Sequence, residues 1–338
     1  MRVSVLVAVY NAEKFLSVCL ESLIHQTHRD IQIICIDDAS TDDSWQILLK
    51  YAAMDDRIVL LKQSENKGQA EARNRGLNVA DGDVVTMLDS DDWLSLDALE
   101  KGCHMMVEDA ELDCVLYDVC YHEEPTGREW KYDYRVNDYE WSGKEAFRLS
   151  LDWSIHGLYM VRREIHQTYP YDTTCRLYSD DNTTRLHFMH SRKVARCEGV
   201  YYYRQHEASM THAVTPLRFL YLDANYSMKQ MMLAEKVSDE LLNQYEDHRW
   251  LNLVGLYVFY WTKRNFFSVE ERRAIRKKLS YFHSTIEVVR LSQSSISKFG
   301  YIPFKSFPFL FELQTFLYTK IRKVVYCLRG KKVPEDWR

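Results

Sequence analysis

The sequence Val84-Val85-Thr86-Met87-Leu88-Asp89-Ser90-Asp91-Asp92 joins a short apolar run to three carboxylates within four residues. A continuous apolar run of this kind is typical of a strand that is buried on both faces of a parallel sheet. In open α/β sheets, ligands bind beyond the carboxyl ends of the strands. Residues 89–92 are therefore expected to lie at the ligand-binding edge of such a sheet.

The same order of apolar run and polar end occurs twice upstream. Val3–Val9 is followed by Tyr10-Asn11, and Ile31–Asp37 is followed by Asp38-Ala39-Ser40-Thr41-Asp42. Regular alternation of strands and helices predicts an α/β fold with a parallel sheet. Between the runs, helices are expected at 14–27, 44–53, 69–79 and 96–107, and a short strand at 58–62.

The pattern changes in the second part of the chain. Further strands are expected at 114–121, 157–161 and 199–204, and the sequence after Pro216 is helical at 217–235, 238–245, 250–264 and 269–282. A domain boundary near residue 212 follows from this change. We expect an α/β domain at 1–212, a helical extension at 213–297 and a basic, aromatic tail at 298–338.

Composition limits the class of protein. The chain has 338 residues with 44 Lys and Arg, 49 Asp and Glu and a formal net charge of −5, which is room for about two domains. The eight cysteines show no C-x-x-C spacing, so we expect reduced thiols in a cytosolic chain. The short apolar start is interpreted as a core strand and not as a leader, and no run is long enough to span a bilayer.

The charge is unevenly distributed. Residues 298–332 hold eight Lys and Arg but only one acid, and 309–328 has the apolar spacing of an amphipathic helix. Such a basic, aromatic segment suits the headgroup layer of an anionic membrane. The alternatives are a helix docked on the protein and a dimer contact. An acidic body argues against nucleic-acid binding.

The negative charges of the acids at the strand ends must be offset by neighbouring groups. Clustered carboxylates stay charged at neutral pH only with a cation or hydroxyl donors nearby, and a divalent cation with oxygen ligands is one solution. For any single acid, a helix N-cap is the simpler interpretation. Gly68 opens a predicted helix beside Lys67, Arg73 and Arg75, which favours an anion. Neither a dinucleotide-binding G-x-G-x-x-G nor a P-loop motif is present.

Four motifs in order resemble family 2 glycosyltransferases of GT-A fold over roughly residues 1–210. They are 5–11, 37–42, Asn66-Lys67-Gly68 with Ala72-Arg73-Asn74, and 88–92. The resemblance implies a GT-A fold with a mixed, mainly parallel sheet, a nucleotide-diphospho-sugar donor (usually a UDP-sugar), inverting transfer and a divalent Mn²⁺ or Mg²⁺. It also implies a catalytic domain at 1–212.

Site roles follow from the same resemblance. Asp91 and Asp89 are expected to bind the metal, and Asp181 with its neighbour Asp180 to act as base and to bind hydroxyls, unless Ser179 or Asp180 is only an N-cap. Asp stands at 180 where the family commonly has Glu, and Ala8 stands where it commonly has Pro. Donor contacts are expected from Tyr10, Asn11, Glu13, Asp38, Ser40, Asn66, Lys67, Arg73, Asp89, Ser90, Asp92, Arg204 and His206.

The remaining expectations concern the segment 201–210, the acceptor and the pathway. The segment resembles the family's closing Tyr-x-Arg-x-His-x-x-Ser motif and would order a lid, or else be a packed strand end. Trp153, His156 and the aromatic segment 130–141 would stack on sugars or simply pack a loop. The function implied is transfer to a glycan or lipid-linked acceptor in surface polysaccharide synthesis, in the cytoplasm at the inner membrane surface. The alternatives are a non-catalytic nucleotide-sugar-binding scaffold and a nucleotidyltransferase.

Overall fold

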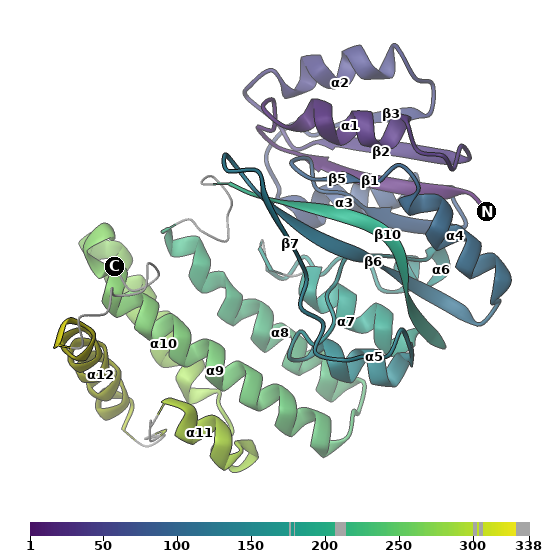
Figure 1. The fold of residues 1–338 in the computed structure, drawn as a ribbon. Coiled ribbons are helices and arrows are strands. Elements are labelled where there is room, and N and C mark those ends of the chain that lie inside the picture. The colour runs from purple at the N-terminus through teal and green to yellow at the C-terminus, as the bar shows by residue number, and fades with distance from the viewer. Residues whose placement is uncertain (176, 179, 207–213, 300–302, 304–306, 329–338) are drawn as a thin grey trace. The chain divides into compact units, whose positions relative to one another are not determined.

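A computed structural model describes the chain except residues 176, 179, 207–213, 300–302, 304–306 and 329–338. It divides into two compact units, Met1–Ser209 and Met210–Arg338. The first unit carries a large sheet and the second is helical (Figure 1).

The first unit is built on a mixed sheet with the strand order β3-β2-β1-β4-β9-β6-β10-β5. Strands β1 to β4 are parallel to one another, β9 is antiparallel to both of its neighbours, and β6 and β10 run parallel. The predicted strands at Val3–Val9, Ile31–Asp37 and 58–62 are confirmed. The bounds are β1 Val3–Val9, β2 Ile31–Asp37, β3 Ile58–Lys62, β4 Val84–Met87, β5 Trp93–Leu94, β6 Leu112–Glu123, β7 Arg128–Lys131, β8 Glu140–Ser142, β9 Tyr159–Arg162 and β10 Lys193–Gln205.

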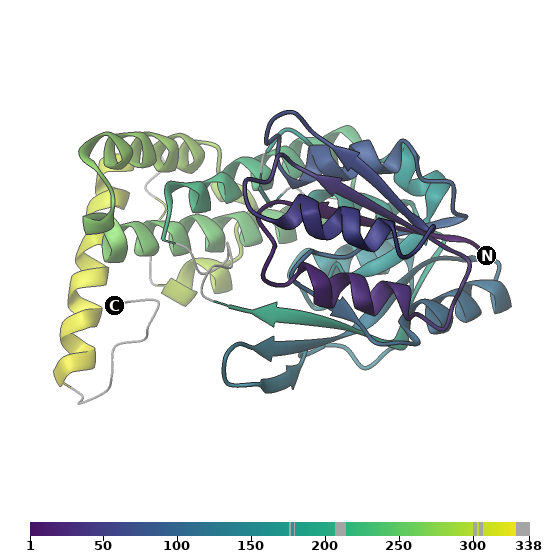
Figure 2. The same ribbon diagram turned by 90° about the horizontal axis from the view of Figure 1, so that it is seen from above.

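Helices cover both faces of this sheet (Figures 1 and 2). Val5 and Val7 of β1 pack in the same cluster as apolar residues of α1, α2 and α4, while Leu6 packs with Ala72 and Leu77 of α3 on the opposite face. Burial on both faces explains the continuous apolar runs. The bounds are α1 Leu16–Ile24, α2 Ser44–Ala52, α3 Gln69–Leu77, α4 Ala98–Glu108, α5 Gly143–Ser150, α6 Arg163–Thr168 and α7 Asp180–His190.

The second half of the sheet differs from its prediction. β10 begins at Lys193 and not at 199, and its pairing with β6 shifts register between Arg196 and Val200. The short strands β5, β7 and β8 were not predicted. β7 is exposed along its whole length and has no alternation of apolar and polar residues to reveal it.

The second unit consists of helices. The helices predicted separately at 238–245 and 250–264 are one continuous helix, α9. The polar residues that suggested a break include Glu246 and Arg249, which are buried in ion pairs. The bounds are η1 Pro216–Leu220, α8 Tyr221–Ala234, α9 Asp239–Lys263, η2 Arg264–Phe266, α10 Val269–Ser284, η3 Val288–Arg290, α11 Gln293–Phe299 and α12 Pro308–Leu328.

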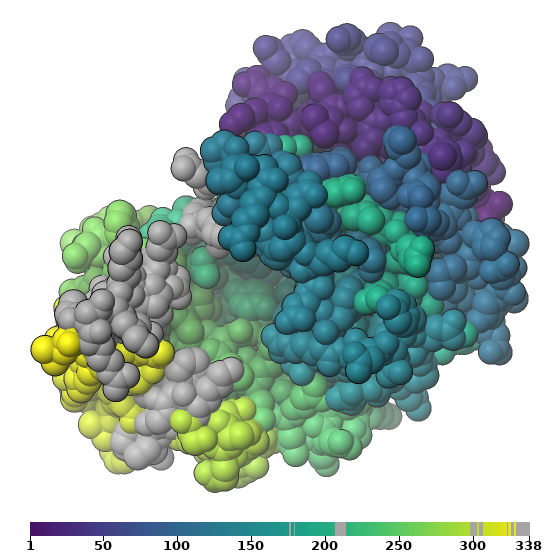
Figure 3. Space-filling model, viewed as in Figure 1, coloured from purple at the N-terminus to yellow at the C-terminus, as the bar shows by residue number. Residues whose placement is uncertain are grey.

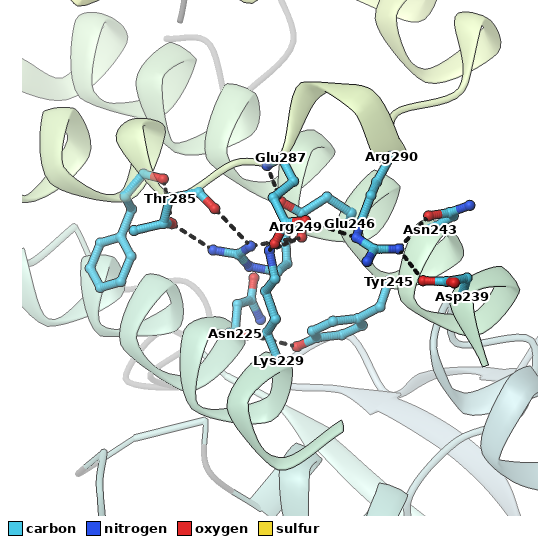
Figure 4. Close-up of polar contacts among 11 residues, drawn as sticks. Asn225, Lys229, Asp239, Asn243, Tyr245, Glu246, Arg249, Thr285, Glu287 and Arg290 are labelled. Atoms are coloured by element: carbon cyan, nitrogen blue, oxygen red, sulfur yellow. Dashed lines mark hydrogen bonds and ion pairs between the residues drawn. The ribbon is translucent and has the colours of Figure 1, made fainter. Parts of the chain in front are cut away.

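A buried charge network joins α8, α9 and the segment after α10 (Figure 4). Lys229 Nζ lies 3.0 Å from Glu246 Oε2 and 2.6 Å from Glu287 Oε1. Arg249 donates to the same Glu246 oxygen at 2.7 Å and to Thr285 Oγ1 at 2.7 Å. Lys229, Glu246 and Arg249 are all buried. In a low-dielectric interior, each of these charges depends on its partners.

The tail helix α12 packs on α9 through its polar stripe. Phe311, Thr315 and Thr319 are buried, and Trp261 Nε1 donates to Thr315 Oγ1 at 3.1 Å. The apolar side chains on its other face are between 39% and 81% exposed; they are Leu310, Leu313, Leu317, Ile321, Val324 and Leu328. This set is called the α12 apolar face below. Among the described residues, no helix combines the length and apolar character needed to cross a bilayer.

Candidate active site

The loops that follow β1 and β2 hold each other at the carboxyl edge of the sheet. Asn11 has a left-handed φ of 50°, its amide donates to Ser40 Oγ at 3.1 Å, and its side-chain oxygen accepts from Thr41 N at 2.8 Å. Glu13 Oε2 accepts from Asp43 N at 2.9 Å. Asn11, Glu13 and Ser40 thus shape the predicted donor site, while Tyr10 is half exposed beside them.

Asp38 anchors the loop that precedes α3. Its buried carboxylate accepts from Gln63 Nε2 at 2.7 Å, Lys67 N at 2.8 Å and Gly68 N at 2.8 Å. Gly68 has a φ of 93°, a conformation that favours glycine. The carboxylate therefore fixes residues 66–68, including Asn66, by holding backbone amides. A contact of Asp38 with a nucleotide base stays a prediction.

Arg73 connects two groups of carboxylates. This buried side chain of α3 forms an ion pair with Asp89, and its guanidinium also lies 3.9 Å from Asp180 Oδ2 at the start of α7. Gln69 Nε2 donates to the same Asp89 oxygen at 2.8 Å. Burial raises the pKa of Asp89, and the Arg73 charge opposes that shift. Arg73 thus connects the end of β4 with Asp180, one of the two carboxylates predicted at the start of α7.

Asp92 supports the 89–92 turn from inside. Its buried carboxylate accepts from the Tyr201 hydroxyl at 2.9 Å and from Arg204 N at 2.7 Å. The same hydroxyl accepts from Asp89 N at 3.1 Å, so Tyr201 holds both ends of the turn. Burial, together with the charges of Asp91 and Asp89, raises the pKa of Asp92 well above its ordinary value. Asp92 thus faces the protein interior. Its contact with a donor stays a prediction.

Asp91 presents its carboxylate at this turn, where its side chain is 36% exposed. His206 Nε2 lies 2.9 Å from Asp91 Oδ2, and Arg204 Nε donates to the Asp91 carbonyl at 2.7 Å. The Arg204 guanidinium lies 4.7 Å from the centre of the Phe15 ring and pairs with Glu124. Arg204 and His206, the two donor contacts predicted from the closing motif, therefore both reach Asp91. Residues 207–210 of that motif lie outside the described residues.

The residues around Asp91 fit a divalent ion of the predicted kind. In the described part of the chain, no group of three or more His, Cys, Asp or Glu could hold a metal. Mg²⁺-type ions are commonly bound through one or two carboxylates and complete their shell with water and substrate phosphate. Asp91 provides such a carboxylate, with His206 beside it. Asp89, the other predicted ligand, has one oxygen occupied by Arg73 and Gln69.

Helix α7 begins at Asp180 and Asp181, the two carboxylates predicted to act as base and to bind hydroxyls. Asp180 and Asp181 both lie in its first turn and are partly exposed. Behind them, buried Asn182 donates from Nδ2 to Asp172 Oδ2 at 2.9 Å, which fixes the start of the helix to the preceding loop. Ser179, the alternative cap, lies outside the described residues.

Two further predicted donor contacts lie in loops. Ser90 lies in the 89–92 turn, and Lys67 Nζ contacts Glu65 at 3.6 Å.

Four of the residues suggested as a sugar-stacking wall, Tyr132, Tyr134, Trp153 and His156, contact one another. The Tyr132 hydroxyl donates to the Trp153 carbonyl at 2.5 Å, and the Tyr134 hydroxyl lies 2.5 Å from His156 Nε2. Arg185 lies over the Trp153 ring at 4.8 Å.

The sequence did not predict the site contacts of Tyr201, Glu124 and Phe15. Only the Tyr triplet at 201–203 offered a signal for one of them.

Comparison with known proteins adds to this geometry. Residues 4–170 match the family described as "Glycosyl transferase family 2". Glycosyltransferase GlyG of Streptococcus pneumoniae is 28% identical over 220 residues, which span 62% of this chain and 72% of GlyG. An Escherichia coli protein named UDP-Glc:alpha-D-GlcNAc-diphosphoundecaprenol beta-1,3-glucosyltransferase WfaP is 39% identical over 104 residues, 31% of this chain and 41% of WfaP.

The relatives differ in how much of their length is matched. Other curated glycosyltransferases are covered over as little as 15% of their length. The crystal structure of S. aureus TarS 1-349 in complex with UDP-GlcNAc has a TM-score of 0.71 and 18% identity, covering 99% of this chain and 93% of that chain. This likeness confirms the predicted GT-A architecture with a helical region after it.

Proposed function

Residues 4–170 belong to glycosyltransferase family 2, and we propose that the protein is an inverting, metal-dependent glycosyltransferase of bacterial surface polysaccharide synthesis. The donor proposed is a UDP-sugar, and the acceptor is a hydroxyl of a glycan or lipid-linked saccharide. The names of WfaP and of the TarS complex support this donor class. The observation that carries the proposal is Arg73, which joins Asp89, in the turn proposed to bind the metal, and Asp180, in the first turn of α7, in one charge network.

The leaving group of such a transfer develops negative charge on its diphosphate. A divalent ion held by Asp91 would supply charge neutralisation when bound. Arg204 adds positive charge at the same turn, and both Arg204 and His206 are already oriented by contacts with Asp91. Groups that are oriented before the reaction stabilise developing charge without reorganisation.

The attacking hydroxyl must lose a proton on the opposite face of the sugar. Asp180 Oδ2 lies 3.9 Å from the Arg73 guanidinium, so this carboxylate is already engaged by a cation. We therefore assign proton removal to Asp181 and the binding of hydroxyls to Asp180. This assignment retains the base predicted from the sequence.

The decisive experiment separates binding from chemistry. UDP-glucose and UDP-GlcNAc are incubated with wild-type protein and Mn²⁺, and UDP release to water is measured beside UDP affinity by calorimetry. Asp181→Asn should reduce UDP release by about a hundredfold or more while UDP affinity is retained. Asp56→Asn removes an exposed carboxylate elsewhere in the first unit and serves as the matched control. Wild-type protein that binds UDP without turnover would support the scaffold alternative instead.

The metal is tested at its proposed ligand. Asp91→Ala should abolish the dependence of UDP affinity on Mn²⁺, because the exposed carboxylate of the turn is lost. The measurement is UDP affinity with Mn²⁺ and with EDTA. Equal Mn²⁺ dependence in wild type and variant would contradict the metal assignment.

We also propose that the α12 apolar face lies on a membrane surface. The support is a row of exposed aliphatic side chains on a helix whose polar stripe is turned to α9, with Lys320 exposed nearby. Lys305, Arg329, Lys331 and Lys332, also part of the predicted membrane segment, lie outside the described residues. This surface would keep the enzyme close to a lipid-linked acceptor.

Liposome co-sedimentation tests this surface. Leu317→Glu should reduce binding to anionic vesicles of phosphatidylglycerol by about tenfold, because a charge replaces a lipid-facing side chain. Leu49→Glu is the matched control, since Leu49 is 48% and Leu317 47% exposed. Equal losses in both variants, or no loss in Leu317→Glu, would count against membrane attachment through this face.

A further inference from the structure

A cavity of about 460 Å³ lies in the first unit, beside the segment that connects β7 to β8. β7 pairs with β6 while β8 pairs with β10, so residues 132–139 connect strands that lie on different sides of the β6–β10 pair. The exposed surface that β7 contributes is part of the blue region in Figure 3. The residues of this cavity that carry the argument are Lys101, Asp118, Lys131, Tyr134, Tyr139 and Arg196.

Arg196 is held rigidly at this cavity. Its guanidinium lies 4.1 Å from the centres of both the Tyr134 and Tyr139 rings, and its Nε is 3.3 Å from Asp118 Oδ1. The Tyr134 hydroxyl is fixed in turn by the Tyr117 carbonyl at 3.1 Å. A guanidinium enclosed by two rings and a carboxylate is already oriented for a ligand.

The charges of the lining leave one cation in excess. Arg196 is paired with Asp118, and Lys101 Nζ contacts Asp97 at 2.8 Å. Glu198 is the other acid of the lining, and its charge acts on Lys101. The Lys131 side chain has no ion-pair or hydrogen-bond partner among the residues that the structure describes. A negatively charged group would complete the set.

Tyr139 supplies a surface beside this cation. It is 59% exposed although one side of its ring covers Arg196. Binding pockets for small molecules typically combine aromatic walls with a few fixed polar groups. Tyr139 and Lys131 line the same cavity, and an exposed ring together with an ammonium suits a sugar ring that carries a carboxylate or phosphate.

The cavity and the candidate active site both include residues of β10. Val200 lines the cavity, and because side chains alternate along a strand, Tyr202 and Arg204 follow on the same face. Trp93 stacks on Tyr202 with ring centres 5.0 Å apart, and the Arg204 guanidinium lies 4.5 Å from the Trp93 ring. Tyr202 and Trp93 therefore form an aromatic contact beside Arg204, which donates to the turn that carries Asp91.

We propose that this cavity binds an anionic sugar of the acceptor glycan, away from the hydroxyl that is glycosylated. The sugar ring would lie on Tyr139 and its negative group between Lys131 and Arg196. The proposal rests on the proposed function for the identity of the glycan. The cavity itself is tested by binding, independently of turnover.

The probes are 4-nitrophenyl β-D-glucuronide and its uncharged counterpart, 4-nitrophenyl β-D-glucoside. Calorimetry is carried out on the full chain with saturating UDP and Mn²⁺, so that the donor site is occupied. Wild-type protein should bind the glucuronide at least about tenfold more tightly than the glucoside. Lys131→Gln should remove this preference, and Tyr139→Ala should weaken both probes.

Two variants control for general effects. Lys50→Gln removes an exposed lysine elsewhere in the first unit, and Tyr281→Ala removes a tyrosine that is 55% exposed in the second unit. Neither should change binding of either glycoside. Wild-type protein that binds neither probe, shows no preference, or keeps its preference in Lys131→Gln would overturn the proposal. Release of UDP from UDP-glucose by wild-type protein separately tests the proposed function.

Discussion

The substitution Tyr201→Phe tests whether a single buried hydroxyl positions the 89–92 turn, which carries the proposed metal ligand Asp91. It removes the 2.9 Å hydrogen bond to Asp92 Oδ2 and the acceptor of Asp89 N at 3.1 Å, while the ring remains. A buried acceptor that loses its hydrogen-bond donor costs about 1–3 kcal/mol. We therefore expect the free energy of unfolding to fall by that amount at neutral pH. UDP affinity in Mn²⁺ should weaken by about tenfold or more, because Asp91 lies in the same turn.

The loss of stability should depend on pH. The pKa of Asp92 is raised in the folded protein, so the folded state keeps a proton that the unfolded chain releases above about pH 4. Stability contributed by this group is therefore present at low pH and lost as pH rises through the folded pKa. The hydrogen bond from the Tyr201 hydroxyl lowers the pKa of Asp92, so removal of this hydroxyl raises that pKa further. The destabilisation should be larger at pH 7.5 than at pH 4.5.

The control is Tyr117→Phe. Tyr117 is equally buried, and its hydroxyl donates to Thr86 Oγ1 at 3.0 Å without touching a carboxylate. Urea unfolding at the two pH values should show a pH-independent loss of about 1 kcal/mol for this control and unchanged UDP affinity. If Tyr201→Phe binds UDP as the wild type does, or if the two variants show the same pH profile, the positioning role of Tyr201 is refuted.

Three further substitutions test other parts of the structure. Asp38→Asn should weaken UDP affinity about tenfold in calorimetry, because a charged acceptor of the Lys67 and Gly68 amides is lost; unchanged affinity would show that this loop does not shape the donor site. Arg73→Lys should lower the free energy of unfolding by about 2 kcal/mol or more and abolish UDP release, since one ammonium cannot reach both carboxylate groups; full turnover would argue against a bridging role. Glu246→Gln should cost about 3–5 kcal/mol in urea unfolding, because two buried cations lose their shared carboxylate; a loss below 1 kcal/mol would mean that water reaches this network.

The sequence predicts most of the parallel half of the sheet. Strands buried on both faces leave uninterrupted apolar runs, and Val3–Val9 and Ile31–Asp37 show them over their full observed length. The polar ends of these strands indicate the carboxyl edge, where the structure places Asp38, Asp89 and Asp91. Periodicity also predicts α12 to within one residue.

The remaining features depend on contacts between distant residues. Tyr201 and Asp92 are 109 positions apart, and only the folded register of β10 brings them together. The continuity of α9 was missed because Glu246 and Arg249 look like exposed polar residues until Lys229 is placed beside them. The cavity at Arg196 lies beside a register shift in β10 that no local pattern reveals.

The buried Lys229–Glu246–Arg249 set also limits how this helical unit can change in evolution. A mutation of any one member leaves an unpaired charge in the interior, whereas replacing the whole set with apolar residues of similar size can be neutral or favourable. Intermediates between these two states are unstable, so the three positions should vary together among descendants of this sequence. Homologues are then expected to keep all three charges or to have lost them as a group.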